Sequence, residues 1–420
     1  MPKQFSAFVY VLLAAIFFTV PAMARECSVQ FNAYGLIQEA LDKQIDVELL
    51  KKQGGMIDGY IRHAEKFLNP ELEHFTTTGP QYGSYNITSE TRLWFHLQTW
   101  GKRHKRGAVV RADKSINDIN VLVEETRVVR ALFLTMLRHK QIEEEKERLD
   151  SIREVIGDLL QKYKKVGFLS AEQTLEKGSL EIADEELSLN ITQLSNEHQG
   201  IKKYYQTITR SECEVDLELR KSKQNVWPDL NGVRYIPEQS MFTKLSELAL
   251  EKSKLQFRYE QAMAIPDVKV GPIWQLNEFN RREYNIFGVG IIIPLPVFDR
   301  NQGLKSAASI DIERSQKRLD FNQQEMDREF KLNHRRYMNL FKQIMDFRKD
   351  QNLKAQLLTN RDLFKRGLIS IPLFLTYKRE QVGLINKMNT LELDLGSYLS
   401  EIFIINNVPL ATEGTKVLSL

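Results

Sequence analysis

Hydrophobic side chains recur at spacings of three, four and seven residues in four long stretches of the chain. This spacing is typical of helices that pack as coiled coils. Between Leu304 and Arg366 there is no glycine or proline over 63 residues, and one helix of that length would measure about 95 Å. We therefore expect four long helices. Their seam positions are Ile142, Leu149, Ile152, Ile156, Leu159, Tyr163 and Val166; Leu187, Ile191, Leu194, His198, Ile201, Tyr205 and Ile208; Met326, Phe330, Tyr337, Leu340, Ile344 and Phe347; and Val382, Ile385, Met388, Leu391, Leu395, Tyr398, Ile402 and Ile405.

Two other stretches, 93–98 and 287–293, alternate with period two, which predicts strands with one apolar face. We expect two strands in each half of the chain, which is too few to close a barrel. An open sheet edge cannot face lipid, because its backbone groups would lack partners. Membrane insertion would therefore require several copies. Trp94, Trp100, Trp274 and Tyr284 are expected either at a membrane interface or as ordinary packing residues.

The two halves of the chain resemble each other. Lys165–Ser170 is similar to Arg366–Ser370, and Pro70 and Gly107 precede Pro266 and Gly303 by 196 residues each. The expected element order is the same in both halves: helix, strand pair, long helix, glycine turn, long helix. We therefore predict two repeats, at 25–227 and 228–420.

The N-terminus has the features of a secretory signal peptide at 1–24. Lys3 precedes an apolar run from Phe8 to Val20, and Pro21–Ala24 ends in an Ala-x-Ala pattern. A membrane anchor is the alternative, but the run is shorter than the roughly 20 residues of a spanning helix. The longest later apolar stretch, Ile286–Phe298, has 13 residues and contains two glycines and two prolines. Any entry into a membrane is therefore expected to use strands.

Composition and charge exclude several classes of protein. The chain has 420 residues, 42% of them hydrophobic and 27% charged, which excludes a disordered chain and a helical membrane protein. The formal net charge of +4 gives no reason to expect nucleic acid. The basic cluster Lys102–Arg106 is expected at a membrane surface. The two cysteines, Cys27 and Cys213, suit a disulfide in an exported chain. Two free thiols, or a lipid-modified Cys27, stay open as alternatives.

No catalytic or cofactor motif is recognisable. The seven histidines are scattered without metal-ligand spacing, so we expect them to be solvated or packed and predict neither a metal nor a cofactor. Gly288-Val289-Gly290 lacks the third glycine and the helix of a dinucleotide loop. We interpret it as a strand that needs small side chains. The histidines are His63, His74, His96, His104, His139, His198 and His334.

Ile293–Gly303 resembles the strand-to-helix junction of the outer membrane efflux protein family, whose best-known member is TolC, and Trp100–Gly107 resembles the matching junction of the first repeat. Both segments are similar to the heavy-metal efflux branch. The resemblance implies an α+β membrane protein and a homotrimer. It further implies a twelve-stranded outer-membrane barrel, four strands per chain, continued by a long periplasmic barrel of α-helical coiled coils. It also implies a periplasmic adaptor protein, an inner-membrane pump and outer-membrane lipids as partners.

The glycine turns at Gly167 and Gly367 are expected at the periplasmic tip, about 90 Å from the barrel if the helices are continuous. Apolar residues at such a tip indicate a docking surface, although local packing is an alternative. Ser170 and Ser370 are expected as N-caps. No carboxylate follows the second turn in 367–376, so an acidic selectivity ring is not expected there. The predicted docking residues are Val166, Gly167, Phe168, Ser170, Gly367, Leu368, Ile369 and Ser370.

These expectations describe a passive exit duct of a tripartite efflux pump or a type I secretion system, with no catalytic activity. A periplasmic adaptor is one alternative, but adaptors carry one helical hairpin flanked by β-rich domains. A soluble coiled-coil scaffold, with its strands packed on its own helices, is the other.

Overall fold

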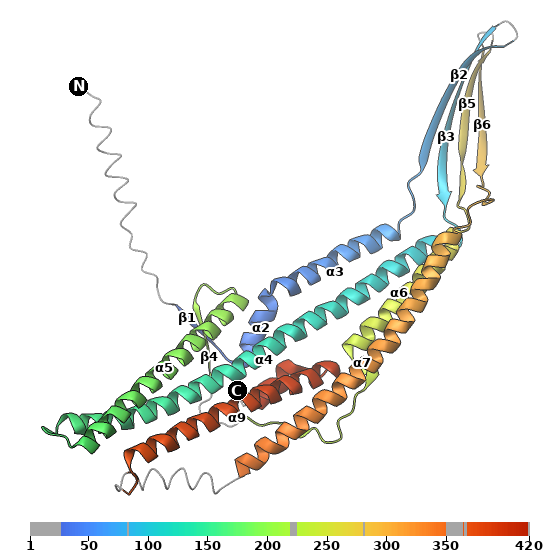
Figure 1. Cartoon of the computed structure of the whole chain (residues 1–420). Coiled ribbons are helices and arrows are strands. Elements are labelled where there is room, and N and C mark those ends of the chain that lie inside the picture. The colour runs from blue at the N-terminus through green and yellow to red at the C-terminus, as the bar shows by residue number, and fades with distance from the viewer. Residues whose placement is uncertain are drawn as a thin grey trace, which may run out of the picture.

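The computed structural model describes residues 27–81, 84–218, 225–279, 282–349, 364 and 368–418. The expected signal peptide at 1–24 and Gly367 lie outside these residues. The molecule is long and narrow, with a four-stranded sheet at one end and helices that extend away from it (Figure 1). Within the described residues, no helix combines the length and the hydrophobicity that crossing a bilayer requires.

Helices account for most of the structure. Some of them lie between the sheet and the middle of the molecule, others pack in the far half, and the longest extends from the sheet to the far end (Figure 1). The helices are α2 (Ala33–Lys43), α3 (Ile45–Ala64), α4 (Lys102–Lys164), α5 (Ala171–Ile208), α6 (Met241–Met263), α7 (Gln302–Lys349), α9 (Ile371–Ile405) and α10 (Leu410–Leu418), with a 3₁₀ turn η1 (Pro237–Gln239). The strands are β1 (Ser28–Phe31), β2 (Glu71–Gln81), β3 (Ser84–Leu97), β4 (Glu214–Leu217), β5 (Val268–Phe279) and β6 (Arg282–Ile292).

The apolar core lies where α2, α4, α9 and α10 meet. Its fully buried side chains include Leu36, Leu132, Met136, Leu395 and Leu399. From there the core continues along two helix pairs, in which α5 packs on α4 and α9 packs on α7. The predicted seams are confirmed, because most of their positions are buried in this core. The buried seam positions are Ile142, Leu149, Ile152, Ile156, Leu187, Leu194, Ile201, Tyr205, Ile208, Phe330, Tyr337, Ile344, Leu395, Ile402 and Ile405.

One of the two helix starts differs from that expected. Gly303 is the second residue of α7 and so lies at its start, as expected, whereas Gly107 lies in the second turn of α4 and does not mark the junction. Instead Gly101, in the left-handed region with φ +65°, precedes the first residue of α4. A residue without a Cβ adopts this backbone conformation without a steric penalty.

The basic cluster therefore forms the first turns of α4. Lys102 is 3% exposed, and its Nζ donates to Oδ1 of Asp267 at 2.6 Å. Arg106 donates through Nε to the backbone oxygen of Ala64 at 2.8 Å. Of these two residues, only Lys102 is buried too deeply for the expected contact with a membrane surface, and for Arg106 that expectation stays a prediction. Their partners are distant in sequence, so a local charge run does not reveal them.

The large sheet has the order β2-β3-β5-β6, and all of its neighbours are antiparallel. Directly paired residues share a face, so the register divides the sheet into two unlike surfaces. The apolar face carries Leu72, Leu93, Phe95, Leu97, Val270, Pro272, Trp274, Phe287, Val289 and Ile291. The charged face carries Glu71, Glu73, Glu90, Arg92, Trp94, His96, Lys269, Gly271, Gly288 and Gly290, together with the apolar Phe75, Ile273, Ile286 and Ile292.

Trp94 lies on the charged face and is 3% exposed, so the expectation of a membrane-interface position is wrong for this residue. Its Nε1 donates to Oε2 of Glu73 at 2.8 Å. The indole fills the space above Gly290, where an added Cβ would lie 2.6 Å from Cη2 of the ring. The predicted need for a small side chain is thus confirmed at Gly290 but not at Gly288, where a Cβ would meet nothing within 4 Å.

A second, parallel sheet of β1 and β4 was not predicted. A disulfide joins Cys27 to Cys213. Cys27 directly precedes β1, and Cys213 directly precedes β4. Cys213 lies beyond α5, because this helix ends at Ile208 and the chain turns at Arg210, which has a positive φ of 46°. The disulfide and the two strands together fix the start of the described chain to the segment that follows the C-terminus of α5.

Candidate functional site

The apolar face of the sheet is not covered by the rest of the chain. Phe287 is 79% exposed and Val289 76%, and Leu72 and Ile291 on the same face are also exposed. The apolar surface continues into the loop that follows β6, where Leu295 and other apolar side chains are exposed. Apolar area in contact with water is unfavourable roughly in proportion to its size. This face therefore requires a nonpolar environment that the single chain does not supply.

The charged face has the opposite character. Glu71 accepts hydrogen bonds from Nζ of Lys269 at 2.5 Å and from Nε2 of His96 at 2.8 Å. Arg92 donates through Nε to Oε1 of Glu90 at 2.7 Å. The Glu71 contacts link β2 to β3 through His96 and, across β3, to β5 through Lys269, whereas the Arg92–Glu90 pair lies within β3. All of these pairs remain partly open to solvent. One side of the sheet thus suits water and the other suits hydrocarbon.

The outer strands of this sheet, β2 and β6, are each paired on one side only within the described residues. Their outward backbone groups are therefore available for strands of another copy. In lipid no water is present to form hydrogen bonds with these groups. Each unpaired backbone group then costs on the order of several kcal/mol of free energy, as measured for the transfer of an amide from water into hydrocarbon.

Those predicted docking residues that the structure describes, all except Gly367, lie at the end of the molecule opposite the sheet. The α4–α5 turn and the start of α9 both lie at that end (Figure 1). Phe168 is 89% exposed, and Val166 and Leu368 are exposed as well, whereas Ile369 is half-buried. Arg379 of α9 pairs with Glu186 of α5 at 2.6 Å, which holds the two helices together near this end.

The capping roles of the two serines differ. Ser170 forms a full capping box with Gln173, in which each side chain bonds the other's backbone nitrogen. Ser370 occupies the N-cap position of α9, but its side chain makes no cap hydrogen bond. Gly167 has no positive φ, and an added Cβ would meet nothing within 4 Å, so the turn itself does not require a glycine there.

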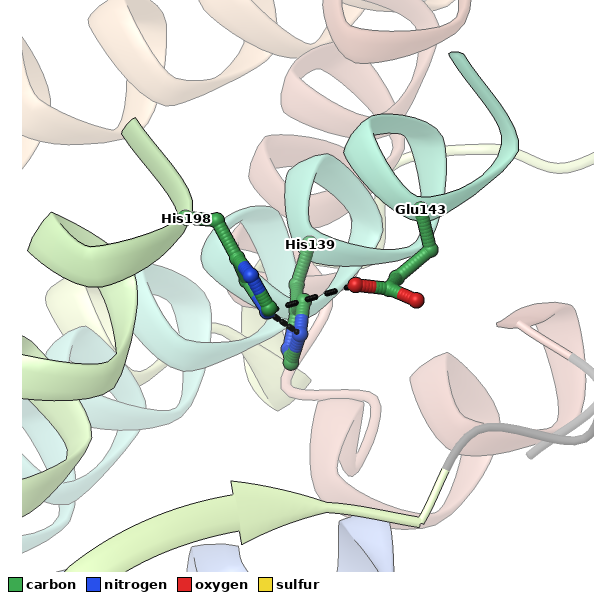
Figure 2. Close-up of side chains that lie close together, drawn as sticks. All are labelled: His139, Glu143 and His198. Carbon is green, nitrogen blue, oxygen red and sulfur yellow. Dashed lines mark hydrogen bonds and ion pairs between the residues drawn. The ribbon is translucent and has the colours of Figure 1, made fainter. Parts of the chain in front are cut away.

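A cluster that was not predicted lies in the α4–α5 hairpin. Figure 2 shows His139 and Glu143 of α4 pointing toward His198 of α5. The Nε2 atoms of the two histidines are 2.8 Å apart, and Nε2 of His198 lies 3.4 Å from Oε1 of Glu143. The histidines were expected to be solvated or packed, and that expectation did not include a contact between two of them. The sequence signal was the spacing of four between His139 and Glu143, together with a histidine at a seam position of the next helix.

Burial shapes the protonation of this cluster. Burial, with a smaller contribution from the neighbouring His198, lowers the pKa of His139 to about 4. The pKa of His198 is also lowered, mainly by burial and against the pull of Glu143. Both rings are thus neutral near pH 7. Nδ1 of His139 is buried and has no hydrogen-bond partner among the described residues.

No protein-family model and no curated protein sequence matches the chain. Several solved structures do. CusC superposes with a TM-score of 0.67 at 15% identity, over 92% of this chain and 95% of its own. The MtrE outer membrane channel of Neisseria gonorrhoeae gives 0.67 at 11% identity, over 89% and 88%. The CmeC outer membrane channel of Campylobacter jejuni gives 0.66 at 10% identity, over 92% and 89%. The chain therefore has the fold of these outer-membrane channels, as its resemblance to the outer membrane efflux protein family implied.

Proposed function

We propose that this chain is a subunit of a passive outer-membrane exit duct of the outer membrane efflux protein family, without enzymatic activity. The observation that carries the proposal is the two-faced sheet. It stands at one end of a long helical body, with exposed Phe287 and Val289 on one face and the Glu71 ion pairs on the other. Strands of outer-membrane barrels alternate in this way, with apolar side chains toward lipid and polar ones toward the lumen.

The assembly that this sheet suits is a homotrimer. Three copies of the four-stranded sheet supply twelve strands, and closing them removes the unpaired edges of β2 and β6. The apolar face would then contact outer-membrane lipids, and the charged face would line the lumen.

The helices would form the periplasmic part of the duct. α4 has 63 residues and would extend about 95 Å if straight, long enough to continue the barrel as a tunnel. In this interpretation 25–227 and 228–420 are two repeats, each with a strand pair and a helical hairpin. Residues 1–24 would direct export and be removed.

The exposed apolar tip suits a protein partner. Val166, Phe168 and Leu368 face solvent at the end where a periplasmic adaptor would join the duct to an inner-membrane pump. A tripartite efflux pump and a type I secretion system both fit this arrangement. The segments Gly101–Arg103 and Phe298–Gly303 favour the heavy-metal efflux branch.

The two alternatives fit the observations less well. A coiled-coil scaffold was expected to pack its strands on its own helices, whereas the apolar face is open. A periplasmic adaptor was expected to have one helical hairpin, whereas both α4–α5 and α7–α9 pack as helix pairs.

Membrane fractionation tests the proposal. The full chain is expected in the outer membrane and to require detergent for release, and in planar bilayers it should form ion-conducting pores. Val289→Asp places a charge on the apolar face and should abolish insertion. Gln275→Glu, on the charged face, is the matched control and should insert normally. Release of the unmodified protein by salt alone would contradict the proposal.

A further inference from the structure

We propose that His139, Glu143 and His198 form a binding site for a divalent transition-metal ion of the Zn²⁺ type, which would cross-link α4 and α5. The three residues each offer one ligand atom, and these atoms all lie within 4.8 Å of one another. Two imidazole nitrogens and one carboxylate oxygen are a donor set that suits Zn²⁺, Cu²⁺ and Ni²⁺ and that disfavours Mg²⁺ and Ca²⁺.

The spacing of the ligands is close to what an ion needs. Zn²⁺ holds nitrogen and oxygen ligands at about 2.0–2.2 Å, so neighbouring ligand atoms in a tetrahedral site lie about 3.3 Å apart. The separation of 3.4 Å between His198 Nε2 and Glu143 Oε1 already matches this value. The two histidine nitrogens, at 2.8 Å, must move apart by about 0.5 Å as their hydrogen bond is replaced by two metal bonds.

The protonation state of the two imidazole rings suits the replacement of their hydrogen bond by two metal bonds. A metal binds neutral imidazole, and both rings lie in surroundings that favour the neutral form. One ring must hold a proton on Nε2 to make the hydrogen bond, and on metal binding that proton would move to its Nδ1. No net proton is then released. The existing hydrogen bond leaves the His139 ring with a buried, unpartnered Nδ1, so the pair is not part of a completed hydrogen-bond network.

The site is accessible, and its charge environment is balanced. His139 is buried at the base, whereas the side chains of His198 and Glu143 are 15% and 39% exposed, which leaves a path for the ion and a position for water. Two lysines, Lys202 on α5 and Lys146 on α4, act on His198. Glu214 and Asp216 of β4 both pair with Lys202, at 3.2 and 3.3 Å. Glu143 thus supplies the charge that compensates the ion.

The position of the site gives the ion a structural role. His139 and His198 lie 59 residues apart in sequence, on opposite arms of the hairpin. Tyr205 lies about two turns after His198 on α5. Its ring packs against His139, with the two ring centroids 5.7 Å apart. A bound ion would therefore fix the register of the two arms next to the β1–β4 sheet and the disulfide.

Titration of Zn²⁺ alone into the purified, chelator-treated full chain in detergent tests the proposal. Calorimetry should give one ion per chain, and the thermal midpoint should rise with Zn²⁺ but not with Mg²⁺. Glu143→Gln, which keeps the shape of an accessible side chain, and His198→Ala should each weaken binding about tenfold or more. His104→Ala, at an exposed histidine of α4, is the matched control and should bind as the unmodified chain does.

Absorption spectroscopy at the zinc edge should report two imidazole nitrogens and at least one carboxylate oxygen. Equal Zn²⁺ affinity in the Glu143→Gln, His198→Ala and His104→Ala variants would overturn the proposal and leave a simple histidine–histidine hydrogen bond. If His198→Ala fails to fold, Glu143→Gln decides the question by itself. The assay requires no transport, so its outcome is independent of the proposed duct function.

Discussion

Replacing Gly290 by alanine tests the packing of the charged face. The new Cβ would lie 2.6 Å from Cη2 of Trp94 and 2.8 Å from Cδ1 of Ile273. Carbon atoms pack at about 3.5–4.0 Å, so the indole would have to move by about 1 Å. Overpacking of this kind costs about 1–3 kcal/mol. The shift would also weaken the 2.8 Å hydrogen bond from Trp94 to Glu73, at about 1 kcal/mol more.

The expected loss of folding free energy is therefore about 2–4 kcal/mol. Urea unfolding of the detergent-solubilised protein, followed by tryptophan fluorescence, measures it. Gly288→Ala is the matched control on the same strand and face, because its Cβ would meet nothing within 4 Å. It should leave stability unchanged or raise it by up to about 1 kcal/mol.

A double mutant separates packing from other effects of the alanine. When Trp94 is already replaced by leucine, Gly290→Ala should cost much less, because the ring it displaces is absent. Equal stabilities of Gly290→Ala and Gly288→Ala in the otherwise unmodified chain would refute the assigned position of Trp94 and the register of β3, β5 and β6.

Three further predictions concern other parts of the chain. Cys27 and Cys213 should appear as one cross-linked species in mass spectrometry of non-reduced peptides, and two alkylatable thiols would refute the pairing. Because their sequence separation is 186, reduction should cost about 5 kcal/mol of folding free energy in the chain-entropy model. Gly367→Glu or Leu368→Asp should abolish export while assembly and insertion persist, and normal export would exclude the turns as the docking tip. Arg348→Met should cost about 2–3 kcal/mol in thermal or urea unfolding, because Glu392, 2.6 Å away and mostly buried, would lose its ion-pair partner. Arg328→Met, in an exposed pair, should cost at most about 1 kcal/mol, and equal losses would contradict the difference in burial.

The helical hairpins could be predicted because their information is local. A seam repeats every turn or two, so Ile142, Ile152 and Ile156 identify the buried face of α4 without knowledge of its partner. The helix start could not be predicted in the same way. Gly107 was interpreted as a boundary, but it lies inside α4, where a Cβ would be 2.8 Å from Cγ of Glu65 at the end of α3. The glycine permits close packing of two helices.

For the strands as well, the local sequence predicts only part of the structure. Their alternation predicts two faces, and the apolar one proves to be the exposed one. The position of Trp94 depends on Gly271 of β5 and Gly290 of β6. These glycines are distant in sequence but lie level with Trp94 in the register of the sheet. An aromatic residue in an alternating strand could therefore not be assigned to lipid or to the lumen side from its own segment.

The His139, Glu143 and His198 cluster depends on the register of a hairpin with a 59-residue separation. Seam periodicity indicates which face of each helix is buried, but a slip of one turn would separate the two histidines. For the same reason the parallel pairing of β1 with β4 had no sequence signal, since each strand has only four residues.

The central claim is that the sheet edges of one chain are completed by two other copies. Native mass measurement of the purified protein in mild detergent tests this claim most directly. We expect a particle of three chains, which separates into single chains when the protein is denatured. A stable particle of one chain that still forms a closed barrel would contradict the account.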